Sequence, residues 1–590
     1  MKQSRIWGGK ILLSVLIVAT GFSQSAIAFC GFFVSKNEAK LSNSASRVII
    51  ARQGDRSIFT MANNYQGDVT DFARIVPIPT IPTREQVSIG DNEVIQKLDD
   101  FTAPRLVRYV DDVNRMLSRE IRTYGQIITV ILIVGLGIIL PCWIGYRKRK
   151  LHWVLLALFT IGGSIALLLP SLLGQANKAK QSLSQNSTSN VTVEESFTVG
   201  EYDVAILSAT ESDSLVAWLQ QNEYNVSNQA RSLLQDYIDR DMKFFVVRVN
   251  LEAFSREGHG FLRPIVIDYQ SPEILLPIRL GTLNADADQD LLVFFLSPQY
   301  YAKVSNYRTV TIPTDARSRY REPSGSELPA FLQNEFGEFY EAIFQKQYEV
   351  EGKNVAFLEY AGYTGKCDPC STQAPTSDLL KQAGAFWEEG GDFPLSAITR
   401  LHVRYNAENF PEDLKFVEVE QQELQIEIAS EEKYFPNWGG VTFQGRYVMR
   451  EPEKGSSGLA KWRYHDRYQS QWNQNLAELT GWDLKDIQEK AKQYEETISL
   501  ARKWEKQGDL ARELNKYETA LQYYDRAIET APNLSSIWLS KALIVDMRLQ
   551  RKEEALKILE EGIDKHGILN GKILYHRNRL QYKLEVEQKN

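Results

Sequence analysis

Two long apolar runs, IITVILIVGLGIILPCWIG (Ile127–Gly145) and HWVLLALFTIGGSIALLLPSLL (His152–Leu173), stand in the first third of the chain. Each run has about 20 residues, the length at which an α-helix crosses the roughly 30 Å hydrocarbon core of a bilayer. We therefore expect a two-helix transmembrane hairpin over 126–173, with its helices at about 126–145 and 152–173.

The short loop between the two runs, 146–151, indicates the orientation of this hairpin. It holds four consecutive cations, Arg147, Lys148, Arg149 and Lys150. Basic loops stay in the cytoplasm, so both flanks of the hairpin should lie on the other side of the membrane. The sequence thus predicts a protein of the plasma membrane, or an equivalent inner membrane, that contacts the lipid bilayer through 126–173.

The N-terminus has the layout of a secretory signal peptide. Cations at Lys2 and Lys10 precede an apolar stretch, Ile11–Phe22, and a small-x-small site ends at Ala28. We expect a signal peptide over 1–28 that is cleaved after Ala28, with uncleaved anchoring as the alternative. Both interpretations place the bulk of the chain outside the cytoplasm.

The composition is typical of a multi-domain globular protein. The chain has 590 residues, enough for a few domains of about 150 residues each. Hydrophobic residues make up 43% of the sequence and the formal net charge is −7. Because this balance implies no large basic surface, we expect no nucleic-acid partner.

Three of the four cysteines, Cys30, Cys367 and Cys370, fall in segments expected outside the cytoplasm. Cys367-Asp368-Pro369-Cys370 has the spacing of a redox motif, in which a lowered thiolate pKa supports thiol–disulfide exchange. A structural disulfide, within this pair or from one member to Cys30, is the simpler interpretation. Metal ligation together with His259 or His402 is a further alternative, but these histidines lack ligand-like spacing.

Segments on both sides of the hairpin mix strand and helix patterns. Arg47–Met61 reads as a β-hairpin around Gly54, whereas Pro104–Tyr124 has helical spacing. Further strands are expected at Lys243–Val249 and elsewhere, helices at Asp213–Gln220, Asn228–Ile238 and Leu328–Tyr348. This irregular order is typical of an α+β fold and not of a doubly wound sheet.

The last hundred residues carry an internal helical repeat. They match the pattern W-x3-G-x2-A-x8-A-x3-Y-x2-A-x4-P of a 34-residue tetratricopeptide repeat, at Trp504, Gly508, Ala511, Ala520, Tyr524, Ala527 and Pro532. A degenerate second unit starts at Trp538. The small residues allow two helices to approach closely, and we expect the resulting groove to bind a protein partner. A plain helical bundle with no binding role is the alternative.

Many short segments of the body resemble a bacterial family known as domain of unknown function 2330. They include Cys30-Gly31-Phe32-Phe33, Val76-Pro77-Ile78-Pro79-Thr80, Leu276-Pro277-Ile278-Arg279-Leu280-Gly281, Asn306-Tyr307-Arg308-Thr309-Val310, Thr399-Arg400-Leu401-His402-Val403-Arg404-Tyr405 and Phe410-Pro411-Glu412-Asp413-Leu414. The resemblance covers about Cys30–Tyr109 and Phe197–Arg450 and implies an exported protein, but no activity.

The chain departs from this family where the hairpin interrupts what resembles one continuous domain. Two packed antiparallel helices leave and return about 8–10 Å apart, so an inserted hairpin is tolerable. We predict an extracytoplasmic α+β domain interrupted by a transmembrane hairpin and followed by an all-α tetratricopeptide-like domain. The expected parts are a split domain of 29–125 with 195–451, a linker at 174–194, a connecting segment at 452–483 and the repeats at 484–590.

Signatures of hydrolases, P-loop proteins and zinc peptidases are missing from the sequence. Asn284–Asp290 alternates oxygen ligands but has Phe295 where a calcium loop needs glutamate, which favours a solvated turn. His402 alternates with apolar neighbours on a strand and is expected to be packed or exposed, not catalytic.

We therefore expect no catalytic, cofactor-binding or metal-binding residues. The preferred hypothesis is a non-enzymatic, membrane-anchored scaffold, and the alternative is a thiol–disulfide redox protein using Cys367 and Cys370.

Overall fold

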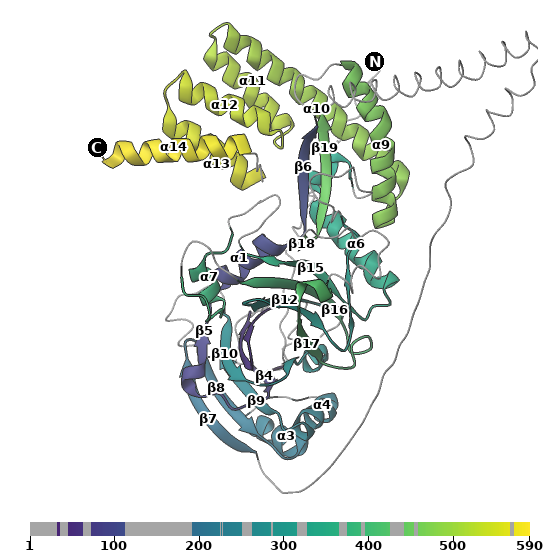
Figure 1. Ribbon diagram of the computed structural model, residues 1–590, viewed down its shortest axis with the longest axis vertical. Helices are drawn as coiled ribbons and strands as arrows, with labels where there is room; N and C mark the ends of the chain where they lie inside the picture. Colours follow the sequence, from purple (N-terminus) through teal and green to yellow (C-terminus); the bar gives the residue numbers. More distant parts are fainter. Residues whose placement is uncertain are drawn as a thin grey trace, which may run out of the picture.

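The computed structural model describes most of the body and nearly all of the C-terminal region. The described residues are 32–35, 45–62, 72–111, 191–222, 224, 226, 228–249, 262–284, 287–314, 327–364, 374–390, 396–424, 442–452, 458–566 and 571–589. They form a body rich in β-structure and a helical tail, which lie at opposite ends of the view in Figure 1.

The largest sheet of the body has nine strands. Its order is β14 (Arg308–Thr311), β15 (Val355–Tyr363), β16 (Ala397–Tyr405), β12 (Gln289–Ser297), β2 (Ala45–Gln53), β3 (Arg56–Met61), β10 (Ile265–Gln270) and β5 (Val87–Ile89), with β18 (Thr442–Gln444) paired to β15. Successive side chains of a strand point to opposite sides, and in the central strands β15, β16 and β12 both sets are largely buried. Their sequences accordingly read as continuous apolar runs.

Three smaller sheets are found in the described part of the body. A five-stranded sheet has the order β1 (Phe32–Ser35), β4 (Phe72–Ile78), β9 (Lys243–Val249), β8 (Tyr202–Ser208) and β7 (Thr192–Val199). A three-stranded sheet joins β11 (Ile274–Leu276), β17 (Leu414–Val419) and β13 (Tyr301–Val304), and a two-stranded sheet joins β19 (Arg446–Pro452) and β6 (Arg105–Asp111). The predicted linker therefore overlaps β7, which begins at Thr192.

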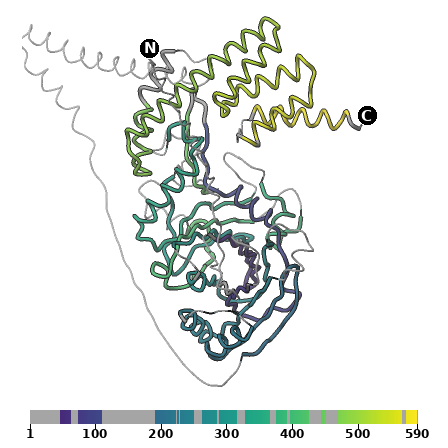
Figure 2. The backbone as a smooth tube through the Cα atoms, turned by 180° about the vertical axis from the view of Figure 1, so that it is seen from behind, coloured from purple at the N-terminus to yellow at the C-terminus, as the bar shows by residue number. Residues whose placement is uncertain are grey.

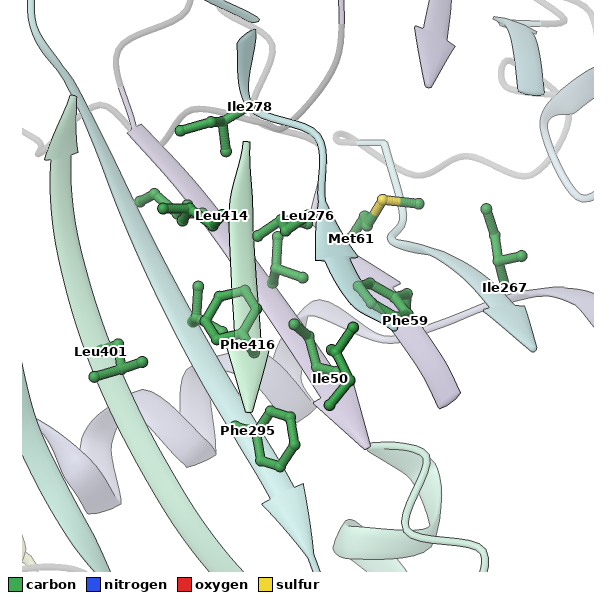
Figure 3. Packing of buried hydrophobic residues seen from close by; sticks show 14 of the residues in the cluster. Ile50, Phe59, Met61, Ile267, Leu276, Ile278, Phe295, Leu401, Leu414 and Phe416 are labelled. Carbon is green, nitrogen blue, oxygen red and sulfur yellow. The ribbon is translucent and has the colours of Figure 1, made fainter. Parts of the chain in front are cut away.

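The main core lies between the nine-stranded sheet and the five- and three-stranded sheets. Figure 3 shows Ile50 and Phe295 of the large sheet close to Phe416 of β17, and Leu401 and Leu414 belong to the same buried cluster. All five side chains are at most 4% exposed. Burying side chains of this size stabilises the fold by about 1.5–3 kcal/mol each.

Helices cover the outer faces of these sheets. The five-stranded sheet packs on α3 (Ser212–Gln221) and α4 (Asn228–Asp239). The nine-stranded sheet packs on α1 (Asn92–Thr102), α7 (Ser377–Gln382) and α6 (Phe336–Val350). Short 3₁₀ helices, η1 (Arg84–Gln86), η3 (Arg279–Asn284) and η4 (Ala330–Asn334), complete this layer.

The strands before 112 and after 190 pair within common sheets. The β2 strand lies parallel to β12, β3 lies antiparallel to β10, and β4 lies antiparallel to β9. The parallel pair of β6 with β19 rises from the body toward the tail, as Figures 1 and 2 both show.

In its described residues the tail consists of six helices, of which the first two lead out of the body. They are α9 (Gly458–Thr480), α10 (Leu484–Glu513), α11 (Tyr517–Thr530), α12 (Ser535–Met547), α13 (Lys552–His566) and α14 (Gly571–Lys589). The predicted connecting segment, 452–483, thus holds α9.

The structure corrects the predicted fold class. Within the described residues, no helix is both long enough and apolar enough to cross a bilayer. The longest ones, α9, α10 and α14, are rich in charged and polar residues. The two runs expected to form the hairpin, 126–173, lie outside the described residues. The described residues therefore correct the predicted fold class to a mixed α+β body with a C-terminal helical region, and they support neither the transmembrane hairpin nor the membrane localisation based on it.

A second correction concerns Pro104–Tyr124, for which the spacing predicts a helix. The described part instead forms β6, because the β-branched and aromatic residues of Arg105–Asp111 pair with β19. The hairpin expected over Arg47–Met61 is confirmed, with β2 and β3 joined through Gly54 and Asp55. Gly54 has a φ of +60°, which glycine adopts without steric cost.

Candidate binding groove

The sequence-predicted site residues divide into two groups. Cys30, Cys367 and Cys370 lie outside the described residues, as do the four cations of the predicted loop, Arg147, Lys148, Arg149 and Lys150. The residues of the predicted repeat, in contrast, all lie in the described tail.

Gly508 and Tyr524 determine how closely α10 approaches α11. A Cβ atom at Gly508 would lie 2.6 Å from Cε1 of Tyr524, closer than van der Waals contact allows. Tyr524 is fully buried, and its hydroxyl donates a hydrogen bond to Asp509 Oδ1 over 2.8 Å. The glycine therefore makes room for an aromatic ring that joins the two helices.

The other repeat residues lie around this contact. Ala520 and Ala527 are fully buried, and Trp504 stacks on Tyr523 with 6.0 Å between ring centroids. Pro532 lies between α11 and α12, where its carbonyl accepts a 2.7 Å hydrogen bond from Trp538 Nε1. These contacts fit close helix packing, and the assignment as a tetratricopeptide repeat stays a prediction.

A groove with a volume of about 700 Å³ opens where the tail meets the body. Its floor and walls combine apolar side chains with charges of both signs. The lining residues are Pro329, Ala330 and Phe331 at η4, Arg450 of β19, Gln469 and Trp472 of α9, Ala491, Tyr494, Glu495, Ile498, Ser499, Arg502, Glu505, Lys506 and Asp509 of α10, and Leu534 before α12.

The long helix α10 holds the two sides of this groove together. Its first turns pack into the body, where Ile487 and Ala491 join the core around α6 and α9. Its last turns belong to the core of the tail through Ala501 and Ala511. Because one continuous helix contributes to both cores, the groove is preorganised.

Glu327 forms the polar junction behind the groove. Its carboxylate accepts hydrogen bonds from Arg450 Nε (2.5 Å) and from Trp472 Nε1 (3.1 Å), and its carbonyl accepts one from Asn475. Glu327 is only 3% exposed. One buried carboxylate thus fixes two side chains of the groove, one from the body and one from the tail.

Charged residues follow the groove along α10. Arg502 Nη1 donates to Glu505 Oε2 over 2.6 Å and to the Ser536 hydroxyl over 2.7 Å, which links α10 to α12. Glu505 is buried, whereas the Arg502 side chain is 39% exposed. Lys506 is exposed and has no ion-pair partner among the described residues. The groove therefore offers both signs of charge beside apolar surface.

A second polar cluster lies under α6 and α1, on the outer face of the nine-stranded sheet. Glu359 of β15 forms ion pairs with Arg400 and His402 of β16, and Arg400 also pairs with Asp99 of α1. Arg404 pairs with Asp290 of β12. Glu359 and Arg400 are 1% and 5% exposed, so a substrate in solution cannot reach them.

The pKa values in this cluster follow from burial opposed by paired charges. Burial raises the pKa of Glu359, but Arg400 and His402 outweigh it and lower that pKa to about 2. Burial likewise raises the pKa of Asp290, and its bonds to His402 and Arg404 move it well below its usual range. The network is thus charged at neutral pH and holds the sheet to its covering helices.

The sequence carried a signal for this network that its analysis missed. The apolar strand Val355–Tyr363 contains a single ionisable acid, Glu359, and the next strand places Arg400, His402 and Arg404 on one face. A lone carboxylate in a buried strand needs a paired cation. Of the two expectations for His402, packed or exposed, its 13% exposed side chain fits the packed one.

Comparison with known proteins shows one family. The chain matches the model of an uncharacterized protein family conserved in bacteria (DUF2330) over residues 24–417. The chain belongs to this family. No curated protein and no solved structure matches it.

The DUF2330 match ends within β17, so the groove joins the family's domain to a tail that lies beyond the match. Three segments that carry the resemblance meet at Asp413, a residue with a fully buried carboxylate. It accepts hydrogen bonds from the Tyr237 hydroxyl (2.7 Å) and from the backbone N–H groups of Ile278 (3.0 Å) and Arg279 (3.2 Å). Asn306 donates to the Asp413 carbonyl over 2.8 Å. These DUF2330 segments therefore build the domain, and no reacting group follows from them.

Proposed function

We propose that this DUF2330 protein is a non-enzymatic binding protein that holds a segment of another protein in the groove between its body and tail. The observation that carries this proposal is a groove of about 700 Å³ whose walls come from η4, α9 and α10. Ligand sites of this size combine mostly apolar lining with a few polar groups that fix orientation.

The shape of the groove supports a peptide segment as the occupant. Its lining runs along α10 from Ala491 to Asp509, which at 1.5 Å per residue is about 27 Å. This length fits about eight residues of extended chain or several turns of a helix, and a compact small molecule would contact only part of it.

The chemistry of the lining indicates what the segment presents. Phe331, Trp472 and Ile498 form the apolar lining, in which the two aromatic side chains are 4% and 5% exposed and Ile498 is half-buried. Trp472 is held in place by Glu327. Glu495 and Lys506 provide charges of both signs along α10. We therefore expect an amphipathic segment with apolar anchors on one face and charged residues at its flanks.

The test uses synthetic amphipathic peptides, with leucine and phenylalanine along one face, and scrambled peptides of the same composition. Their affinity for the full chain is measured by fluorescence anisotropy. The amphipathic peptides should bind and the scrambled ones should not. Ile498→Glu should weaken binding about tenfold or more, because it places a charge in the apolar groove.

The matched control lies on the same helix. Leu500 is 46% exposed and does not line the groove, so Leu500→Glu should leave the affinity unchanged. Failure of every amphipathic peptide to bind, or equal loss in both variants, would overturn the proposal. The thiol–disulfide alternative stays a prediction, because Cys367 and Cys370 lie outside the described residues.

A further inference from the structure

His402 lies between two carboxylates. Its Nδ1 is 2.9 Å from Glu359 Oε1, and its Nε2 is 3.2 Å from Asp290 Oδ1. A carboxylate accepts hydrogen bonds but cannot donate them when ionised. Both ring nitrogens must therefore carry a proton to satisfy this geometry, which makes His402 an imidazolium.

The ring of His402 also packs against the covering helix α6. Phe344 stacks on it with 4.0 Å between ring centroids and an interplanar angle of 25°. Arg404, two residues along β16, lies over the ring of Phe344, with 4.8 Å between its guanidinium carbon and the ring centroid. Its Nη1 also donates a 2.7 Å hydrogen bond to Gln345 Oε1 of α6. The positive charge of the imidazolium favours this aromatic contact.

Helix α6 in turn holds α9. Phe339 and Ile343 of α6 pack with Leu476 of α9 in one buried cluster, and Lys346 donates to the carbonyl of Glu478. Hence the contacts run without a gap from His402 through Phe344 to α9.

We propose that His402 is a proton-operated clamp that holds α6, and through it α9, against the nine-stranded sheet and releases them when its imidazolium loses a proton. After that loss one ring nitrogen faces a carboxylate oxygen with no hydrogen between them. Two acceptors at this distance repel each other in a buried site. The loss of this hydrogen bond loosens the His402 ring and thereby weakens its stacking contact with Phe344 of α6.

The groups that face His402 from every packed element favour its charged form. Burial by itself lowers the pKa of His402, but Glu359 and Asp290 outweigh it and raise that pKa above its usual value. The surrounding titratable and charged groups are Asp290 of β12, Glu359 of β15, Arg400 and Arg404 of β16, Tyr340 and Glu341 of α6, and Asp99 of α1.

The sign of the pH effect follows from this direction. A folded-state pKa that lies above the unfolded value stabilises the clamp fully at pH values below the unfolded pKa. The stabilisation is lost as the pH rises through the folded pKa. Opening of α6 and α9 should therefore increase on the alkaline side.

The first measurement follows the native protein by NMR with labelled histidine, of which the chain has six residues. The resonance of His402 should titrate above the ordinary histidine value of about 6.5. Hydrogen exchange of α6 and α9 is then compared below and above the measured pKa, after correction for the intrinsic pH dependence of exchange. Protection should fall about tenfold for each unit by which the pKa of His402 exceeds that of the unfolded chain.

The variant His402→Gln should exchange rapidly in α6 and α9, because it lacks the cation between Glu359 and Asp290, and equally at every pH, because glutamine does not titrate. His576→Gln, on α14 and outside this cluster, should retain the pH dependence of the native protein. A neutral His402 below pH 6.5, or the same pH-dependent exchange in His402→Gln as in the native chain, would overturn the clamp. The NMR result stands even if His402→Gln fails to fold, and none of these readouts depends on a ligand in the groove.

Discussion

The cluster under α6 and the groove beside α10 use the same residue types with different access to water. Glu359 and Glu505 are both buried, at 1% and 2% exposure. The partner of Glu359, Arg400, has a side chain that is 6% exposed, whereas the partner of Glu505, Arg502, is 39% exposed. The exposure of the cation thus separates a network that stabilises the fold from a polar edge that remains available for binding.

The largest expected effect is the loss of the Glu359 charge. Glu359→Gln leaves Arg400 and His402 buried without their shared anion, and breaking a buried pair costs about 3–5 kcal/mol. The free energy of unfolding, from urea denaturation, should fall by this amount. Glu93→Gln serves as the control, since Glu93 pairs with Lys97 on the surface, where such pairs contribute about 0.5 kcal/mol or less. Equal effects of the two substitutions would contradict the distinction between the two kinds of charge.

The second effect is acid destabilisation by the same cluster. The pKa of Glu359 falls from 4.5 to about 2 on folding, and that of Asp290 also falls. A depressed folded pKa gives stability that is present above the unfolded pKa and lost as the pH falls through the folded pKa. Stability should therefore drop by on the order of 3 kcal/mol between about pH 5 and about pH 2.

Urea midpoints over this pH range measure the acid effect. In Glu359→Gln the part contributed by Glu359 should be missing, so the pH dependence should be shallower than in the native chain. A pH dependence of unchanged size in the variant would assign acid destabilisation to other carboxylates.

The third effect tests the tail and uses two glycines in helices. A Cβ at Gly508 meets the Tyr524 ring, whereas a Cβ at Gly337 of α6 meets nothing within 4 Å. Gly508→Ala should destabilise the tail by about 1–3 kcal/mol through overpacking. Gly337→Ala should be neutral or stabilising by up to about 1 kcal/mol, because alanine favours helix. Thermal unfolding of both variants decides this, and equal results would remove the argument for a close approach of α10 and α11.

Local patterns in the sequence predicted local elements well. Alternation and turn residues predicted the hairpin around Gly54, and the apolar run Lys243–Val249 has the bounds of β9. These features depend on neighbours a few residues apart.

The wrong and missed features depend on partners far along the chain. Arg105–Asp111 has helical spacing, but its parallel partner β19 begins at Arg446, and long-range pairing overrides local preference. The groove is built from η4, β19, α9 and α10, so no single segment contains its pattern. The lone acid Glu359 was visible in its strand, but its partners become evident only when β15 and β16 are paired.

The smallest expected effect is the loss of the Glu505 charge at the groove, which is compared with the loss of the Glu359 charge under α6. Glu505→Gln removes the anion beside Arg502, but the Arg502 side chain is 39% exposed and can be hydrated, so the cost should be only about 1 kcal/mol. The same substitution should change binding more than stability, because it frees the Arg502 guanidinium for an acidic flank of a bound peptide. Urea denaturation and peptide anisotropy on this one variant measure both quantities. A stability loss as large as that of Glu359→Gln would mean that Glu505 belongs to a closed network, and the groove would then lose its distinction from the cluster under α6.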